Sequence, residues 1–104
     1  MTSEGIGSAV VVPVGDRVDA DTLGAVADHI PTRPAAIVLD LTAVSFLDSA
    51  ALSLLVTEHN RCADHGIPLR LVADTSVVTR PIELTGLDRL LDIHPTVESA
   101  VREE

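Results

Sequence analysis

Residues 36–52 read AIVLDLTAVSFLDSAAL, and this stretch decides the fold. Its first part, Ala36–Leu41, is apolar at every position except Asp40, without the polar alternation of a half-exposed strand. Such a run is typical of a strand buried on both faces, as in a parallel sheet. After a short loop, Asp48 and Ser49 precede apolar residues at helical spacing. The stretch therefore predicts a buried strand, a loop and the beginning of a helix.

The helix that begins near Ser49 is expected to continue to about residue 65. Its expected inward stripe consists of Leu52, Leu55, Val56, His59, Cys62 and Ala63. Gly66 stands where a left-handed residue ends a helix. Ile67 and Pro68 then lead into a second apolar strand over residues 69–73. This part of the chain predicts a strand, a helix and a further strand.

Strands and helices also alternate upstream of this unit and directly after it. Upstream, β-branched residues predict a strand over 8–14, and apolar spacing predicts a helix from Asp21 that Pro31 ends. Downstream, the cap-rich residues 74–76 predict a helix near 76–85. Pro81 lacks a helical N–H donor, so a later beginning, with Pro81 at the first position, is the alternative for this helix.

The last third of the chain completes the alternating pattern. Leu84 is expected on the inner side of the helix near 76–85, and Gly86 is expected to stop it. A short strand over 91–94 and a last helix after Pro95 follow. The predicted fold class is α/β, with a central, mostly parallel or mixed sheet of about four strands and helices mainly on one side.

The length of 104 residues fits one domain, expected over residues 8–104 behind a flexible segment 1–7. Cys62 is the single cysteine, which excludes an internal disulfide and favours a small core residue over a redox sensor. The apolar runs are too short to cross a membrane, and the first residues lack the features of a signal peptide. We therefore expect a cytoplasmic protein without membrane insertion.

Composition argues against nucleic-acid binding. Sixteen acidic and seven basic residues give a formal net charge of −9, so a phosphate backbone would be repelled. With one Phe and neither Trp nor Tyr, the chain also lacks aromatic platforms for bases. The acidic surface suits solubility or attraction to a basic protein partner. Nucleic acid is therefore not an expected partner.

The strongest candidate site is the Asp48–Ser49 pair at the beginning of the helix. In open α/β sheets, sites gather at the carboxyl ends of the strands, where this loop lies. The first N–H groups of the helix are unpaired there, and a phosphate on the serine would meet them. Asp and Ser are also common helix caps, so a purely structural role stays open.

The same segment resembles the signature of the STAS domain family. In that signature an apolar strand ending Asp-Leu-(Ser/Thr) leads to Asp-Ser-Ser-Gly-Leu, matched here by residues 40–42 and 48–52. Three further stretches are similar to family elements in the same order. They are the turn over 15–19, the Leu-Thr-Gly-Leu-Asp element within 84–91 and the beginning of the last helix at 95–100. The similarity runs from about residue 9 to 101.

This resemblance implies an anti-sigma-factor antagonist rather than an enzyme. In such members the first serine of the signature, here Ser49, is phosphorylated by the anti-sigma factor, a serine kinase. The unmodified form binds that kinase and releases a sigma factor, and a serine phosphatase resets the phosphorylated form. The resemblance implies partner binding at Asp48, Ser49 and Ala50, and Asp19 and Ser76, near the beginnings of two other helices, are expected on the same rim. Neither a cofactor nor a metal site is implied.

Two departures and two alternatives accompany this interpretation. Ala50 and Ala51 replace the Ser-Gly of the signature, which places a methyl group where a kinase partner expects bare backbone. STAS domains also act as regulatory subunits of anion or lipid-exporting transport complexes, a second possible function. A small serine hydrolase using Ser49 is a third, although the glycines of a nucleophile elbow are missing.

Other groups of polar residues predict no separate site. Asp16, Asp19 and Asp21 suggest a cation, but the Gly-then-Glu pattern of a calcium loop does not follow them. His59 and His65 are six residues apart, so they face differently around a helix and do not match metal-ligand spacing. The expected roles of these residues are capping, solvation and packing.

Overall fold

The computed structural model describes residues 9–102, and its centre is a four-stranded sheet in the order β1-β2-β3-β4. All three pairs of neighbouring strands are parallel. The strands are β1 (Ala9–Pro13), β2 (Ala36–Asp40), β3 (Leu69–Val72) and β4 (Asp92–His94). The predicted flexible segment 1–7 lies outside the described residues.

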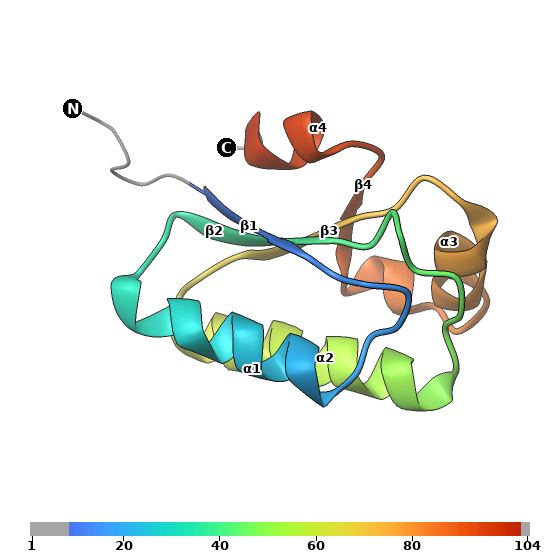
Figure 1. Ribbon diagram of the computed structural model, residues 1–104, viewed down its shortest axis with the longest axis horizontal. Helices are drawn as coiled ribbons and strands as arrows, with labels where there is room; N and C mark the ends of the chain where they lie inside the picture. Colours follow the sequence, from blue (N-terminus) through green and yellow to red (C-terminus); the bar gives the residue numbers. More distant parts are fainter. Residues whose placement is uncertain (1–8, 103–104) are drawn as a thin grey trace.

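Helices connect the strands and cover both faces of the sheet unequally (Figure 1). They are α1 (Ala20–His29), η1 (Ile30–Thr32), α2 (Ser49–Asp64), α3 (Ser76–Leu84), η2 (Leu87–Arg89) and α4 (Val97–Arg102). In Figure 1, α1 and α2 lie side by side on one face, α4 lies on the other, and α3 lies beyond the carboxyl ends of the strands. The predicted α/β fold, with helices mainly on one side, is confirmed.

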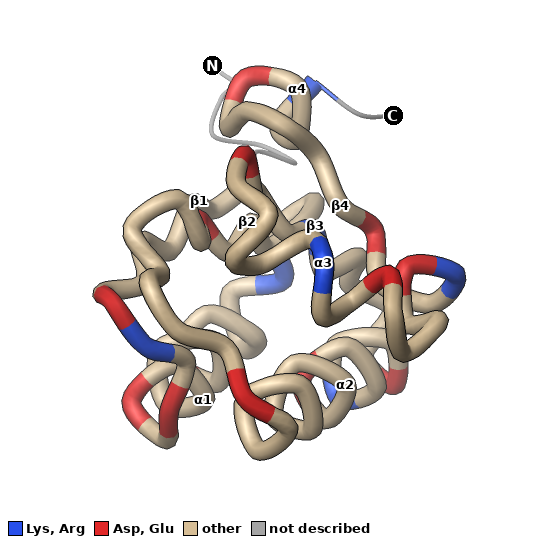
Figure 2. Tube along the Cα trace, turned by 90° about the vertical axis from the view of Figure 1, so that its right-hand side faces the viewer, with Lys and Arg blue, Asp and Glu red and all other residues tan. Residues whose placement is uncertain are grey.

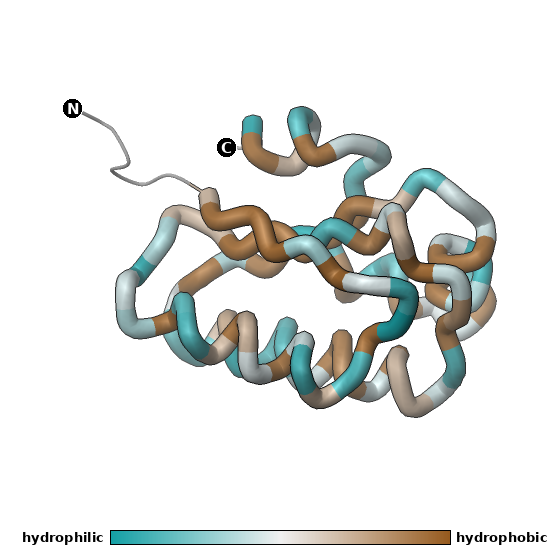
Figure 3. The backbone as a smooth tube through the Cα atoms, in the orientation of Figure 1, coloured by the Kyte–Doolittle hydropathy of each residue, from teal (hydrophilic) through white to brown (hydrophobic). Residues whose placement is uncertain are grey.

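The main core fills the space between the sheet and the α1–α2 layer. Ile37 and Leu39 of β2 contribute to it together with Leu71 of β3, and all three are at most 1 % exposed. The residue between them, Val38, points to the opposite face because side chains alternate along a strand. There it joins a smaller cluster with Val72 and Ala100. Figure 3 shows the hydrophobic residues concentrated along the strands between the two helical layers.

The inward face of α2 differs from the predicted stripe. The buried residues of this helix are Ala51, Leu52, Leu55, Glu58 and Cys62. Val56 and His59 are only half-buried, and Ala63 is exposed. The helix is therefore rotated toward a line through residues 51, 55, 58 and 62, which is a regular stripe at a period of 3.6. Sequence reasoning missed it because that line contains a carboxylate.

The predicted helix near 76–85 is present as α3, but the alternative late beginning and the expected inward place of Leu84 were wrong. The helix begins at Ser76, so Pro81 lies inside it instead of at its first position. Leu84 is 76 % exposed because the inner face is occupied by Val78 and Ile82. The expected ends of the helices were correct, since Gly66 has φ 72° and Gly86 has φ 77°. None of the helices described here has the length and apolar character that crossing a membrane requires.

Candidate functional site

Two loops at the carboxyl ends of β1 and β2 form the foundation of the site. The backbone N–H of Ser45, in the loop before α2, donates to the carbonyl oxygen of Asp16, in the loop before α1, at 3.0 Å. Asp40 ends β2, and its Oδ1 accepts from the backbone N–H of Thr42 at 3.0 Å and from its hydroxyl at 2.7 Å. These bonds fix both loops relative to the sheet and to each other.

Asp48 and Ser49 form the beginning of α2. Asp48 has an extended backbone, and its Oδ1 accepts the N–H of Ala51 at 2.9 Å, so it is the N-cap. Ser49 is the first residue of the helix and is exposed. Ser49 therefore lies exposed at the positive end of the helix dipole. Capping by Asp48 is thus established, and it leaves Ser49 accessible for chemistry.

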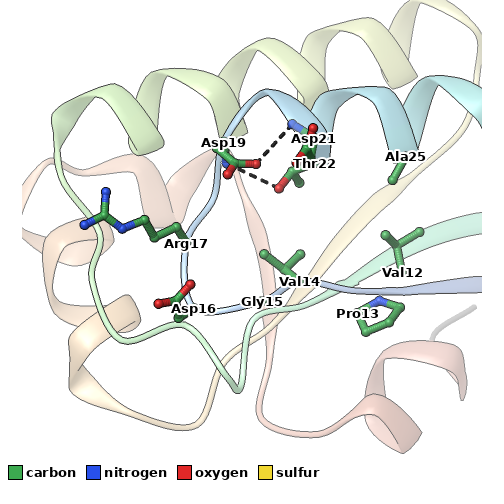
Figure 4. A pocket seen from close by; sticks show the side chains of 10 residues that line it. All are labelled: Val12, Pro13, Val14, Gly15, Asp16, Arg17, Asp19, Asp21, Thr22 and Ala25. Atoms are coloured by element: carbon green, nitrogen blue, oxygen red, sulfur yellow. Dashed lines mark hydrogen bonds between the residues drawn. The ribbon is translucent and has the colours of Figure 1, made fainter.

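Asp19 is the N-cap of α1, as Asp48 is of α2. Its Oδ1 accepts the N–H of Asp21 at 3.0 Å, and its own N–H donates to the hydroxyl of Thr22 at 3.3 Å (Figure 4). Beside these residues a hollow of about 240 Å³ lies between β1 and α1. Its apolar lining includes Val12, Val14 and Ala25, and the side chain of Arg17 points away from them (Figure 4). Within residues 9–102, no group of three or more His, Cys, Asp or Glu side chains is placed to hold a metal ion.

A second hollow, of about 280 Å³, brings three of the predicted site residues together. Asp19, Asp48 and Ala50 line it between the beginnings of α1 and α2. Arg17 and Phe46 form part of its wall, with the guanidinium carbon of Arg17 5.4 Å from the centre of the Phe46 ring. Phe46 is half exposed, at 50 %. Sequence reasoning did not select this pair, although Phe46 is the only aromatic residue of the chain.

Ser49 faces a different hollow from its two neighbours. A groove of about 510 Å³ runs from Ser49 along α2 toward the segment that follows α3. Its lining consists of Ser49, Leu52, Ser53, Val56, Thr57, Thr85 and Leu87. None of these seven side chains carries a charge, which sets the groove apart in a chain of net charge −9. Apolar side chains and hydroxyls of this kind suit contact with an uncharged segment of another protein.

Ser76 is the remaining predicted partner-binding residue. It is the first residue of α3 and is exposed, as its predicted place at the beginning of a helix requires. It lines none of the three hollows described above. Asp19, Asp48 and Ala50 therefore line one hollow and Ser49 lines another, while Ser76 lines none of the three.

The alanines that replace the Ser-Gly of the family signature differ in their surroundings. Ala50 is exposed, so a hydroxyl is missing from the surface there. Ala51 is 4 % exposed and belongs to the main core. Ala51 is the residue that replaces the Gly, and its methyl group packs in the core, so the expected methyl group on the partner-facing surface is largely covered.

Carboxylates dominate the surface around this end of the sheet. Asp16, Asp19 and Asp21 lie at the beginning of α1, and Asp48 lies at the beginning of α2. Figure 2 shows red, acidic segments near the beginnings of α1 and α2. A negative potential at this edge would attract a positively charged protein surface.

Known proteins are similar to this chain in both sequence and fold. A family model for the STAS domain matches residues 2–100. The Mycobacterium tuberculosis protein Rv2638, named provisionally as an anti-anti-sigma factor, is 34 % identical over 106 residues, covering 96 % of this chain and 72 % of that protein. The anti-sigma-F factor antagonist RsfA from the same species is 32 % identical over 100 residues, covering 90 % and 78 %.

A solved structure agrees with these relatives. The crystal structure of an anti-sigma factor antagonist from Mycobacterium paratuberculosis superimposes with a TM-score of 0.78 at 32 % identity. The alignment covers 99 % of this chain and 91 % of that one. The family match spans nearly the whole chain, and the sheet, the helices and the Asp48–Ser49 helix start follow the pattern of the signature. This chain belongs to the STAS domain family.

Proposed function

We propose that this protein is an anti-sigma-factor antagonist that binds an anti-sigma factor through the Ser49 end of α2. Phosphorylation of Ser49 by that factor, acting as a serine kinase, abolishes binding, and a serine phosphatase restores it. The names of the relatives support the antagonist role, since RsfA and RsfB are both anti-sigma-F factor antagonists. In this proposal the protein is a binding module and catalyses no reaction itself.

The exposed position of Ser49 carries the proposal. A kinase must reach the hydroxyl, and Ser49 is exposed at the first position of α2 while the neighbouring Asp48 supplies the cap. The cap function therefore does not occupy the serine. A phosphate at this point adds about −1.5 to −2 charge at the centre of the proposed interface.

The uncharged groove next to Ser49 supports the same placement of the partner. Leu52 is buried and Leu87 is half-buried in its lining, whereas Leu84, which directly precedes the lining residue Thr85, is 76 % exposed. Large apolar side chains left exposed beside a groove are typical of protein–protein contact surfaces. A partner that covers Ser49 would also cover this groove. A phosphate on Ser49 would then be buried next to the uncharged side chains that line it.

Variants at Ser49 test the switch. We expect Ser49→Ala to bind an anti-sigma factor as the parent does but to accept no phosphate from ATP. Ser49→Asp should bind about ten-fold or more weakly, because a buried unpaired charge is costly. Asn60→Asp is the matched control, since it adds the same charge on the exposed side of α2. Calorimetric titration against the anti-sigma-F factor of M. tuberculosis and the anti-sigma factors of the source organism gives the affinities.

Alanine substitutions define the surface. Changes at Asp19, Asp48 and Ser76 should weaken binding by more than about 1 kcal/mol in at least one case. Arg102→Ala, at an exposed position of α4, should have no effect. Equal binding of Ser49→Asp and Asn60→Asp would reduce Ser49 to a structural residue, and a parent protein that binds no anti-sigma factor would refute the proposed function.

A further inference from the structure

Helix α4 lies alone on the face of the sheet opposite α1 and α2 (Figure 1). Its apolar contacts belong to the small cluster in which Ala100 is fully buried and Val97 packs partly buried against Val38 and Val72. The main core cluster includes no residue of α4. Removing α4 from the sheet would therefore leave the main core unbroken.

A buried arginine fastens the end of this helix. Arg70, in the central strand β3, is only 8 % exposed. Its Nη1 donates a hydrogen bond of 2.9 Å to the carbonyl oxygen of Ala100, in the last turn of α4. A cation at this position satisfies a terminal carbonyl group and favours the negative end of the helix dipole. Arg70 Nε also lies 3.9 Å from Asp92 Oδ2.

A second polar contact joins β4 to the middle of α4. His94 is 7 % exposed, and its Nδ1 lies 3.3 Å from the hydroxyl oxygen of Ser99. On its other side, His94 Nε2 lies 3.1 Å from Asp92 Oδ1. Asp92 thus lies close to both His94 and Arg70. The helix is held by directional polar contacts at two points as well as by its few apolar contacts.

We propose that α4 is a releasable strap, which opens as an independent unit while the rest of the domain stays folded, and that Arg70 is its latch. Six residues are far too few for a helix that is stable by itself, so α4 persists only while it is docked. Units with few apolar contacts open locally at a lower free energy than the whole domain. Opening uncovers Val38 and Val72 and brings Arg70 into contact with water, on the face opposite Ser49.

Amide hydrogen exchange of the full chain, followed by NMR, tests the strap. The backbone N–H of Ala100 reports on α4 through its 3.1 Å bond to the carbonyl oxygen of Thr96. The N–H groups of Ile37 and Leu41, bonded to Pro68 at 2.9 Å and Val72 at 2.8 Å, report on the sheet. In the parent, the Ala100 amide should exchange at least about ten-fold faster, relative to its intrinsic rate, than the two sheet amides.

Variants separate a latch from general stability. Arg70→Met should accelerate exchange at Ala100 by about ten-fold or more, because a charge-assisted bond is lost, while the sheet amides change less than about two-fold. Arg80→Met, an exposed arginine of α3, is the matched control and should leave Ala100 unchanged. Ser99→Ala removes the contact to His94 without altering the sheet, and it should likewise accelerate exchange at Ala100. It takes the place of Arg70→Met in this test if Arg70→Met fails to fold.

Two results would overturn the proposal. If Ala100 and the sheet amides of the parent exchange with the same protection and the same dependence on denaturant, α4 opens only with the whole domain. If Arg70→Met, or Ser99→Ala in its place, accelerates all three amides equally, these residues stabilise the fold as a whole and are not a latch.

Discussion

Glu58 shows how far a single residue can depart from its sequence pattern. Its side chain is 1 % exposed on the inner face of α2, with Arg61 Nη2 3.2 Å from its Oε2. Burial raises the pKa of Glu58 above the ordinary 4.5, and the nearby Arg61 opposes part of that rise. Burial, followed by the charge of Glu58, raises the pKa of the Cys62 thiol to about 11. Cys62 therefore remains protonated at neutral pH and acts as a core residue.

The raised pKa of Glu58 has a consequence for stability. The folded state favours the protonated carboxyl, so the stability associated with this group is present below pH 4.5 and is lost as the pH rises through the folded pKa. Glu58→Gln cannot ionise and should be more stable than the parent at pH 7 by about 1 kcal/mol, or about 4–8 °C in Tm. Thermal melts from pH 4 to 8 should show the difference shrinking toward the acidic end.

Glu83→Gln is the matched control for this prediction, since Glu83 is exposed on α3. It should change the Tm little at any pH, because an exposed carboxylate loses no hydration on folding. A Glu58→Gln variant that is less stable than the parent at pH 7 would show that the pair with Arg61 outweighs the cost of burial.

The cap of α2 provides a second residue-scale prediction. Asp48→Ala removes the acceptor for the Ala51 N–H and should lower stability by about 1 kcal/mol, within a range of about 0.5–2 kcal/mol. Urea denaturation gives the free energy of unfolding. Asp74→Ala, at an exposed acid before α3 that does not cap it, should cost much less. Equal losses for both variants would contradict the capping assignment.

At the scale of elements, the sheet was predictable from sequence for a physical reason. The apolar run of β2 is buried at four of its five positions, and only strands covered on both faces need such a run. The ends of the helices were predictable because Gly66 and Gly86 supply left-handed conformations that other residues avoid. Asp48 was predictable as a cap because its short acidic side chain precedes a helical pattern.

The buried faces of α2 and α3 were harder to predict from the sequence. Hydropathy alone places His59 inside and Glu58 outside, whereas the packing of α2 on the sheet buries Glu58. Leu84 was expected inside because it is apolar, but an interaction surface also presents apolar residues to solvent. The pairing of Arg17 with Phe46, 5.4 Å apart, joins two loops whose closeness only the folded chain reveals. Hydropathy therefore misplaces Glu58 and Leu84, and it does not reveal the contact between Arg17 and Phe46.

Pro81 yields a prediction at the scale of a helix. It is the sixth residue of α3, where it offers no N–H to the carbonyl of Val77 and its ring crowds the preceding turn. Pro81→Ala should raise the free energy of unfolding by about 1–2 kcal/mol, which is less than the full helical penalty because the proline also restricts the unfolded chain. Urea denaturation measures it. A loss of stability would mean that packing of the half-buried ring outweighs the helical cost.

At the scale of the whole molecule, the Ser49 site and the α4 strap lie on different surfaces. Ser49, its groove and the acidic loops lie at the carboxyl ends of the strands, whereas α4 and its latch cover the opposite face of the sheet. The main core separates them. A charge added at Ser49 therefore acts first on whatever docks at that end, and it reaches the far face only if the core itself changes.

Phosphorylation of Ser49 should consequently block binding without reshaping the domain. The phosphate meets N–H groups and a favourable helix dipole, worth about 0.3–1 kcal/mol, and it is repelled by Asp48 and the net charge of −9. These opposing effects should leave the stability within about 1 kcal/mol, while a partner that buries the dianion loses several kcal/mol. Melting curves and amide chemical-shift maps of both forms are the measurements, with changes expected only around residues 45–57. Shift changes that extend into β3, or a large fall in Tm, would instead establish an allosteric switch.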